Sequence, residues 1–213
     1  MNVQTGSNLL QLGRTYYEGR TIDTANYGNS VDYEGQEATY RNNSVPAAGQ
    51  TLVLALNAGP ITARVVRNVS GINLLPGRAV IYQAGFQDKR VDGYTNTTAQ
   101  RAAGIVDPFL PSTGVPNGDL FLIIEDGTVP VRRALSNSAA DDAEGDILYA
   151  ITAATSQATT AGRFTRWVGT FSAAETTDGT AFNIQRNAFG LAMSACTTAG
   201  TNQLKNVRVR LGR

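Results

Sequence analysis

The stretch DLFLIIEDGTVPVRRA, residues 119–134, carries the clearest secondary-structure signal in this chain of 213 residues. Apolar, β-favouring residues fill Phe121–Ile124 and Val129–Val131, and Asp126-Gly127 stands between them. An Asp-Gly pair between two such runs is typical of a type I′ turn, whose two central residues both need a positive φ angle. The stretch therefore predicts a β-hairpin.

The residues around this expected turn follow from the same interpretation. Asp119, Glu125 and Asp126 are expected to be turn residues that flank the hairpin. Pro130 has no N–H to donate, so its strand should lie at a sheet edge or turn that position toward solvent. Arg132 and Arg133 are adjacent on a strand and should point to opposite faces of the sheet.

Short β-favouring runs separated by Gly, Pro, Asn and Asp continue along the rest of the chain. The expected strands cover residues 51–56, 61–70, 79–82, 102–107, 147–155, 163–174 and the two strands of Gly190–Leu211. No segment has the periodicity and caps of an amphipathic helix. The pattern predicts an all-β fold, a β-barrel or sandwich of short antiparallel strands that occupies residues 49–213.

The alternation within these runs also predicts the core. We expect these residues to be buried: Leu52, Leu54, Val65, Val80, Ile105, Leu122, Ile124, Ile147, Val168, Phe171, Val207 and Val209. Between two of the strands, Asp88 and Asp92 bracket Lys89-Arg90, which indicates a locally neutralised surface loop.

Residues 1–48 differ in texture from the rest, with frequent Gly and Asn and few aliphatic side chains. Five of the eight tyrosines lie here: Tyr16, Tyr17, Tyr27, Tyr33 and Tyr40. Such a segment cannot bury enough apolar area to order itself, whereas tyrosines are good contact residues. We interpret it as an extended N-terminal arm that orders against a partner through these tyrosines, Arg14 and Arg20. The alternative is a loop-rich lobe folded onto its own domain.

The net charge and the distribution of apolar residues argue against two classes of partner, nucleic acids and membranes. The net charge is +1 and only 16% of residues are charged, without the basic excess of a nucleic-acid-binding protein. No apolar run approaches the roughly 20 residues of a membrane helix. The N-terminal residues lack the pattern of a secretory signal, so we expect synthesis in the cytoplasm.

The residues that would carry catalysis are scarce. The chain has no histidine, which removes the commonest general base and metal ligand. Lysine occurs only at Lys89 and Lys205, and no GxSxG or phosphate-binding loop is present. We expect no enzyme and no cofactor, although a glycosidase with two carboxylates far apart in the chain stays an alternative.

The densest acidic segment is DDAEGD, with Asp141, Asp142, Glu144 and Asp146. Oxygen ligands close in sequence suit a calcium ion, but the spacing does not match an EF-hand loop. We expect a solvated acidic loop and no metal site. The single cysteine, Cys196, lies among small residues and is expected to be buried and unreactive.

The C-terminal stretch FGLAMSACTTAG, residues 189–200, is followed by a strand in which Val207, Val209 and Leu211 alternate with arginines. This pattern resembles the closing hairpin of the small β-barrel capsid decoration (cement) proteins of tailed bacteriophages. NVSGINLLPGRAVIY (68–82) resembles their opening loop and strand. AAGIVD (102–107) and NGDLFLIIEDGTVPVRR (117–133) resemble their central strand and hairpin. The resemblance spans residues 65–211 with gaps.

The resemblance implies a structural virion protein on the outer capsid surface. It would cement neighbouring subunits of the major capsid protein, often as a homotrimer. The N-terminal arm is longer than the minimal family needs, and we expect it to straddle subunit joints. Three alternatives remain. They are another virion part (a tail, fibre-base or minor capsid protein), a carbohydrate-binding β module that uses Trp167 and Tyr94, and an enzyme.

Overall fold

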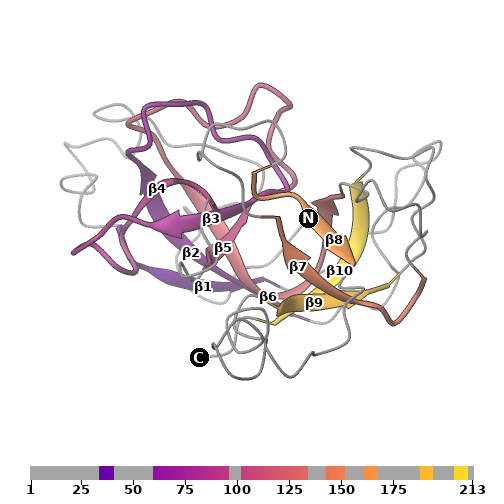
Figure 1. The fold of residues 1–213 in the computed structure, drawn as a ribbon. Coiled ribbons are helices and arrows are strands. Elements are labelled where there is room, and N and C mark those ends of the chain that lie inside the picture. Colours follow the sequence, from indigo (N-terminus) through magenta and orange to yellow (C-terminus); the bar gives the residue numbers. More distant parts are fainter. Residues whose placement is uncertain are drawn as a thin grey trace, which may run out of the picture.

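The computed structural model describes residues 34–40, 60–95, 102–133, 143–151, 161–166, 188–193 and 204–210. Within these ranges the chain forms ten β-strands and no helix, which confirms the all-β class. The strands are β1 (Glu37–Tyr40), β2 (Ile61–Asn68), β3 (Ala79–Tyr82), β4 (Arg90–Tyr94), β5 (Ala102–Val106), β6 (Leu120–Arg132), β7 (Ile147–Ala150), β8 (Phe164–Arg166), β9 (Ala188–Ala192) and β10 (Leu204–Arg210). Figure 1 shows β6 running between the indigo and magenta strands and the orange and yellow ones.

β6 is one strand of 13 residues, so the predicted hairpin is wrong. Gly127 has a φ angle of +127°, but Asp126 does not have the positive φ that a type I′ turn also needs there. Asp126 instead pairs with Thr62 of β2 and with Arg210 of β10. Because partner strands satisfy the backbone on both sides of this point, the chain stays extended where its local sequence favours a turn.

Five strands pair in a closed circuit. β2 pairs with β4, β4 with β3, β3 with β5, β5 with β6, and β6 pairs again with β2. The β2–β4 pair is parallel, so the expected all-antiparallel arrangement is wrong there. From the second half of β6 the sheet continues through β10, β9, β7 and β8, and β1 lies at the opposite edge. The sheet is therefore part circuit and part open extension, and not a clear barrel.

Alternation along β6 sends side chains into two cores. Leu120, Leu122 and Ile124 pack with apolar residues of both halves of the sheet, including β1 and β10. Phe121 and Ile123 pack in a second core that takes residues from all five strands of the circuit. A fully buried aliphatic side chain contributes about 1.5–3 kcal/mol. β6 thus supplies both cores at once, and the two halves of the sheet are held together through it.

Most of the predicted core residues that the structure describes are buried. They are Val65, Val80, Ile105, Leu122, Ile124, Val207 and Val209. The prediction for Ile147 is wrong, because its side chain is 51% exposed while Leu148 and Ala150 face the core. The phase of alternation differs by one residue from the expected one, which moves every side chain of the strand to the other face. Leu52, Leu54, Val168 and Phe171 lie outside the described residues.

The predicted strand positions are largely confirmed. Residues 61–70, 79–82 and 102–107 contain β2, β3 and β5, while β7 and β8 occupy parts of 147–155 and 163–174. β4 forms where a surface loop was expected around Asp92, because its backbone pairs with β2 and β3. Arg132 and Arg133 do point to opposite faces, one half-exposed and the other fully buried.

β1 lies inside the segment that was expected to be an arm. It pairs with β2 in antiparallel register, from Glu37 opposite Arg64 to Tyr40 opposite Ile61. Residues 34–40 are therefore an edge of the folded sheet and not an extended arm. The remaining residues of the expected arm and its boundary at 48 and 49 lie outside the described residues, so that part stays a prediction.

The close approach of β6 to the start of β2 at Gly127 supplies the first test. A Cβ at position 127 would lie 3.0 Å from Cα of Ile61 and 3.1 Å from the carbonyl oxygen of Pro60, at a positive φ angle. We expect Gly127→Ala to lower the free energy of unfolding by about 1–3 kcal/mol more than Gly145→Ala does. Gly145 also has a positive φ, but open space surrounds its Cβ position. Urea unfolding measures both variants, and equal losses would contradict the close approach of β6 to the start of β2.

Candidate functional site

Only one of the sequence-predicted contact residues lies among the described residues. Tyr40, at the end of β1, is 6% exposed and packs in the first core. Its expected role as a partner contact is therefore wrong for the folded sheet, because the ring is turned inward by pairing with β2. The other predicted contacts, Tyr16, Tyr17, Tyr27, Tyr33, Arg14 and Arg20, lie outside the described residues.

What fixes the start of β1 is a set of ion pairs. The Glu34 carboxylate is almost fully buried, and it accepts hydrogen bonds from Nε of Arg67 and, at 3.2 Å, from Nε of Arg90. Arg67 also donates to the carbonyl oxygen of Gly118 at 2.7 Å. Two guanidinium groups from β2 and β4 thus enclose one carboxylate that precedes β1.

A second set of contacts holds β1 up to three residues further along the chain, at Gly35 and Glu37. Arg64 of β2 donates to Oε1 of Glu125 at 2.7 Å, to Oε2 of Glu37 at 2.9 Å and to the carbonyl oxygen of Gly35 at 3.0 Å. The hydrogen bond to Glu125 raises the pKa of the Arg64 guanidinium, against the lowering effect of burial. Burial first, and then the charge of Glu125, raise the pKa of Tyr82, whose hydroxyl lies 3.2 Å from that carboxylate.

We call the residues Glu34, Glu37, Arg64, Arg67 and Arg90 the β1 anchor. The sequence interpretation missed it, because the paired residues are 27 to 56 positions apart and no local motif joins them. Glu125 was expected in a turn and is instead a buried strand residue that faces Arg64. The anchor fixes where the chain preceding residue 34 enters the folded sheet.

A second surface feature lies on β7 and β9. Ile147 and Leu191 are direct cross-strand partners, and Met193 lies one residue beyond the end of β9. Their exposed fractions are 51%, 46% and 42%. We call these three residues the Ile147 patch. Large contiguous apolar patches mark interaction surfaces, and these three residues form a small candidate for such a contact.

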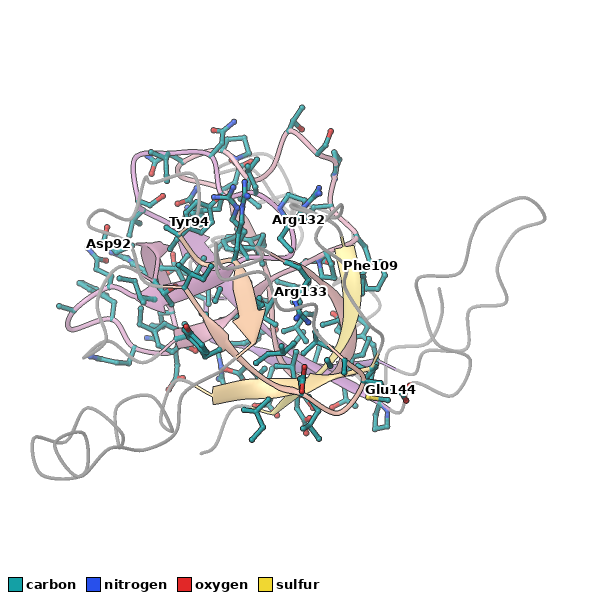
Figure 2. The ribbon with its side chains drawn as sticks, turned by 45° about the vertical axis from the view of Figure 1, so that its right-hand side comes forward. Asp92, Tyr94, Phe109, Arg132, Arg133 and Glu144 are labelled. Atoms are coloured by element: carbon teal, nitrogen blue, oxygen red, sulfur yellow. The ribbon has the colours of Figure 1, made fainter. Side chains whose placement is uncertain are left out.

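The acidic loop forms a tight turn before β7 in its described part. The Asp146 carboxylate accepts the N–H of Ala143 at 2.7 Å, and the N–H of Gly145 donates to the carbonyl oxygen of Ala192. Glu144 is exposed, and Figure 2 shows it far from Tyr94 and Arg132. Asp141 and Asp142 lie outside the described residues. Among the residues that are described, no three His, Cys, Asp or Glu side chains gather as a metal site requires.

Tyr94 does not offer a platform for a sugar. Its ring is 2% exposed, and its hydroxyl accepts the N–H of Leu75 at 2.5 Å. Sugar binding through an exposed aromatic face is thus not available at this residue. Trp167, the other aromatic residue suggested for that role, lies outside the described residues.

Comparison with protein-family models and with curated proteins finds no match to this chain. In the described part of the chain, no helix is long and apolar enough to cross a membrane. Two features of the chain itself bear on its function: the β1 anchor and the Ile147 patch.

The β1 anchor can be tested by removing its buried charge. Glu34→Gln leaves two guanidinium groups without their carboxylate, so we expect a loss of about 3 kcal/mol in the free energy of unfolding. Glu37→Gln is the matched control, because that carboxylate is 40% exposed and its pair contributes at most about 1 kcal/mol. Urea unfolding monitored by circular dichroism gives both values. Similar losses for the two variants would contradict a buried anchor at Glu34.

Proposed function

We propose that this protein is a structural virion protein that binds the outside of a tailed-phage capsid and cements neighbouring major capsid subunits. The resemblance of residues 65–211 to capsid decoration proteins suggests it. The observation that carries it is that two features lie on different halves of one continuous sheet: the β1 anchor, which ties the start of β1 to β2 and β4 by ion pairs within the chain, and the Ile147 patch beside β7 and β9.

The β1 anchor suits a protein whose N-terminal segment binds a neighbouring subunit. The residues that precede Glu34 enter the sheet at a point fixed by three arginines from two strands. Contacts made by an N-terminal arm would therefore be transmitted directly to β2 and β4. Tyrosine side chains in such an arm give a large contact area at little cost in side-chain entropy.

The Ile147 patch suits a second, short-range contact. Ile147 and Leu191 need no conformational change to meet an apolar surface, because the paired strands β7 and β9 already hold their backbone, and Met193 adds apolar area just beyond the end of β9. A single patch of this size gives weak binding by itself. When the same contact is repeated over a shell, or is joined to an arm contact on the same molecule, the combined affinity is far larger.

Cosedimentation tests the proposal. The purified protein is mixed with undecorated shells assembled from the major capsid protein encoded in the same genome, and in separate samples with purified tails and fibres, and each assembly is pelleted. We expect the protein to pellet with the shells in saturable amounts. Pelleting with tails or fibres only would assign it to another part of the virion, and no association with any virion part would overturn the proposal.

The arm contact is tested by truncation at the boundary that the fold defines. Deletion of residues 1–33 leaves β1 and its anchor in place, so we expect an unchanged melting transition and shell binding at least tenfold weaker. Replacing Tyr16, Tyr17, Tyr27 and Tyr33 with Ala should weaken binding in the same direction. Equal binding of the truncated and intact proteins would contradict a contact role for the arm.

The patch contact is tested separately. We expect Ile147→Ser with Leu191→Ser to weaken shell binding severalfold, because each substitution removes apolar area that the partner would cover. Phe86→Ser is a control on the other half of the sheet, since Phe86 is similarly exposed but lies between β3 and β4. The Phe86 ring lies 4.3 Å from the guanidinium carbon of Arg90, so the free energy of unfolding of this variant is measured as well, to show that the β1 anchor is intact. A loss of binding in the control equal to that of the double variant would remove the patch from the proposal.

We further propose that the protein acts as a homotrimer, as the resemblance implies. Light scattering on the free protein and the copy number per site on decorated shells measure this. A monomer in both conditions would contradict it.

A further inference from the structure

Three arginines from distant parts of the chain meet where the five-strand circuit joins the extension of the sheet. Arg78 precedes β3, Arg132 ends β6 and Arg163 precedes β8. Backbone hydrogen bonds hold the three segments side by side. The N–H of Arg132 donates to the carbonyl oxygen of Gly77 at 2.8 Å, and the N–H of Ala79 donates to that of Gly162 at 2.8 Å. We call Arg78, Arg132 and Arg163 the arginine junction.

The backbone segments at this junction pack closely against one another. A Cβ at Gly162 would lie 2.4 Å from the carbonyl oxygen of Ala79 and 3.2 Å from Cβ of Tyr94. The segment that carries Arg163 therefore packs directly on β3 and β4. The three arginines are presented from a fixed frame, as a preorganised binding site requires.

Arg78 is held in place by aromatic and backbone contacts. Its guanidinium carbon lies 4.7 Å from the centre of the Tyr94 ring, and Nη1 donates to the carbonyl oxygen of Ala161 at 3.5 Å. Tyr94 in turn is buried and hydrogen-bonded. Figure 2 shows Tyr94 and Arg132 in the upper half of the view and Arg133 below Arg132, and Arg133 is fully buried.

The charges at the junction oppose one another. Burial, followed by the positive charges of Arg78 and Arg132, lowers the pKa of the Arg163 guanidinium. Burial also lowers the pKa of Arg78, and Arg132 adds to this effect. Nε of Arg163 is itself buried and has no hydrogen-bond partner within the described part of the chain, although the whole side chain is only half-buried. An anion placed between these groups would offset the repulsion and accept the N–H of Arg163.

We propose that the arginine junction is a binding site for a small tetrahedral oxyanion of the phosphate or sulfate class. Guanidinium groups bind such anions through paired, charge-assisted hydrogen bonds, and partial burial strengthens those bonds. Arg132 and Arg163 keep enough exposure for an anion to reach them from solvent. The site joins the circuit to the extension of the sheet, so an anion bound there stabilises their mutual packing. It does not depend on the capsid role.

The first test uses inorganic phosphate and the intact protein. Thermal unfolding is followed in phosphate, sulfate, acetate and chloride at equal ionic strength. We expect phosphate and sulfate, at ten times their Kd, to raise Tm by about 3–6 °C relative to chloride. No difference from chloride would overturn the proposal, and an equal rise with acetate would overturn the assignment to a tetrahedral anion.

The second test locates the site. We expect Arg163→Gln to weaken phosphate binding, measured by calorimetry, by about tenfold or more. Arg163→Lys keeps the charge without the planar pair of donors and should weaken it less. Lys89→Gln, which removes an exposed cation between β3 and β4, is the control and should leave binding unchanged. Undiminished binding in the Arg163 variants would place the anion elsewhere and overturn the proposal.

The stability of Arg163→Gln in chloride gives an independent readout. Because the substitution removes a repelling charge, we expect its Tm to equal or exceed that of the unmodified protein. A large fall in Tm would mean that the Arg163 guanidinium is already neutralised within the chain, which would overturn the proposal. If that variant does not fold, Arg163→Lys decides the question through its affinity for phosphate.

Discussion

The passage of β6 through Gly127 is the constraint on which the rest of the sheet depends. Before this residue β6 pairs with β2 and β5, and after it β6 pairs with β10 alone among the named strands. The close approach of the Gly127 backbone to Ile61 leaves no room for a side chain. One strand can therefore close a five-strand circuit with its first half and start a four-strand extension with its second half. Both apolar cores take side chains from it, so neither half is packed independently.

The edge of the sheet at β1 is held differently from its interior. Only Ala38 and Tyr40 of β1 contribute to the core, which is a small apolar area for an edge strand. The β1 anchor adds one buried carboxylate that pairs with β2 and β4 and one partly exposed ion pair with β2. Buried ion pairs are costly to break, because the remaining charge is left without compensation. Charge pairing thus specifies where the chain joins the sheet, while apolar burial supplies most of the stability of its centre.

The surface features fit a protein that acts through contact. The Ile147 patch presents apolar side chains from two paired strands, and the arginine junction presents cations from three segments that only the fold brings together. The first favours an apolar protein surface and the second favours a small anion, so the two are separable by experiment. In the proposed capsid role, a rigid sheet keeps such contacts at fixed spacing over many copies of the shell.

The sequence by itself determined the all-β class, most strand positions and most of the described core. These depend on β-favouring residues and two-residue alternation, which are local properties. It did not determine that Asp126-Gly127 continues a strand, that Glu34 joins Arg67 and Arg90, or that Ile147 faces solvent. Each of these was decided by pairing between segments far apart in the chain: β2 and β10 flank β6, the strands of the circuit bring the anchor charges together, and β9 sets the phase of β7. Local preferences of about 1 kcal/mol per residue are outweighed when the backbone of a whole strand gains hydrogen-bonding partners and a buried face.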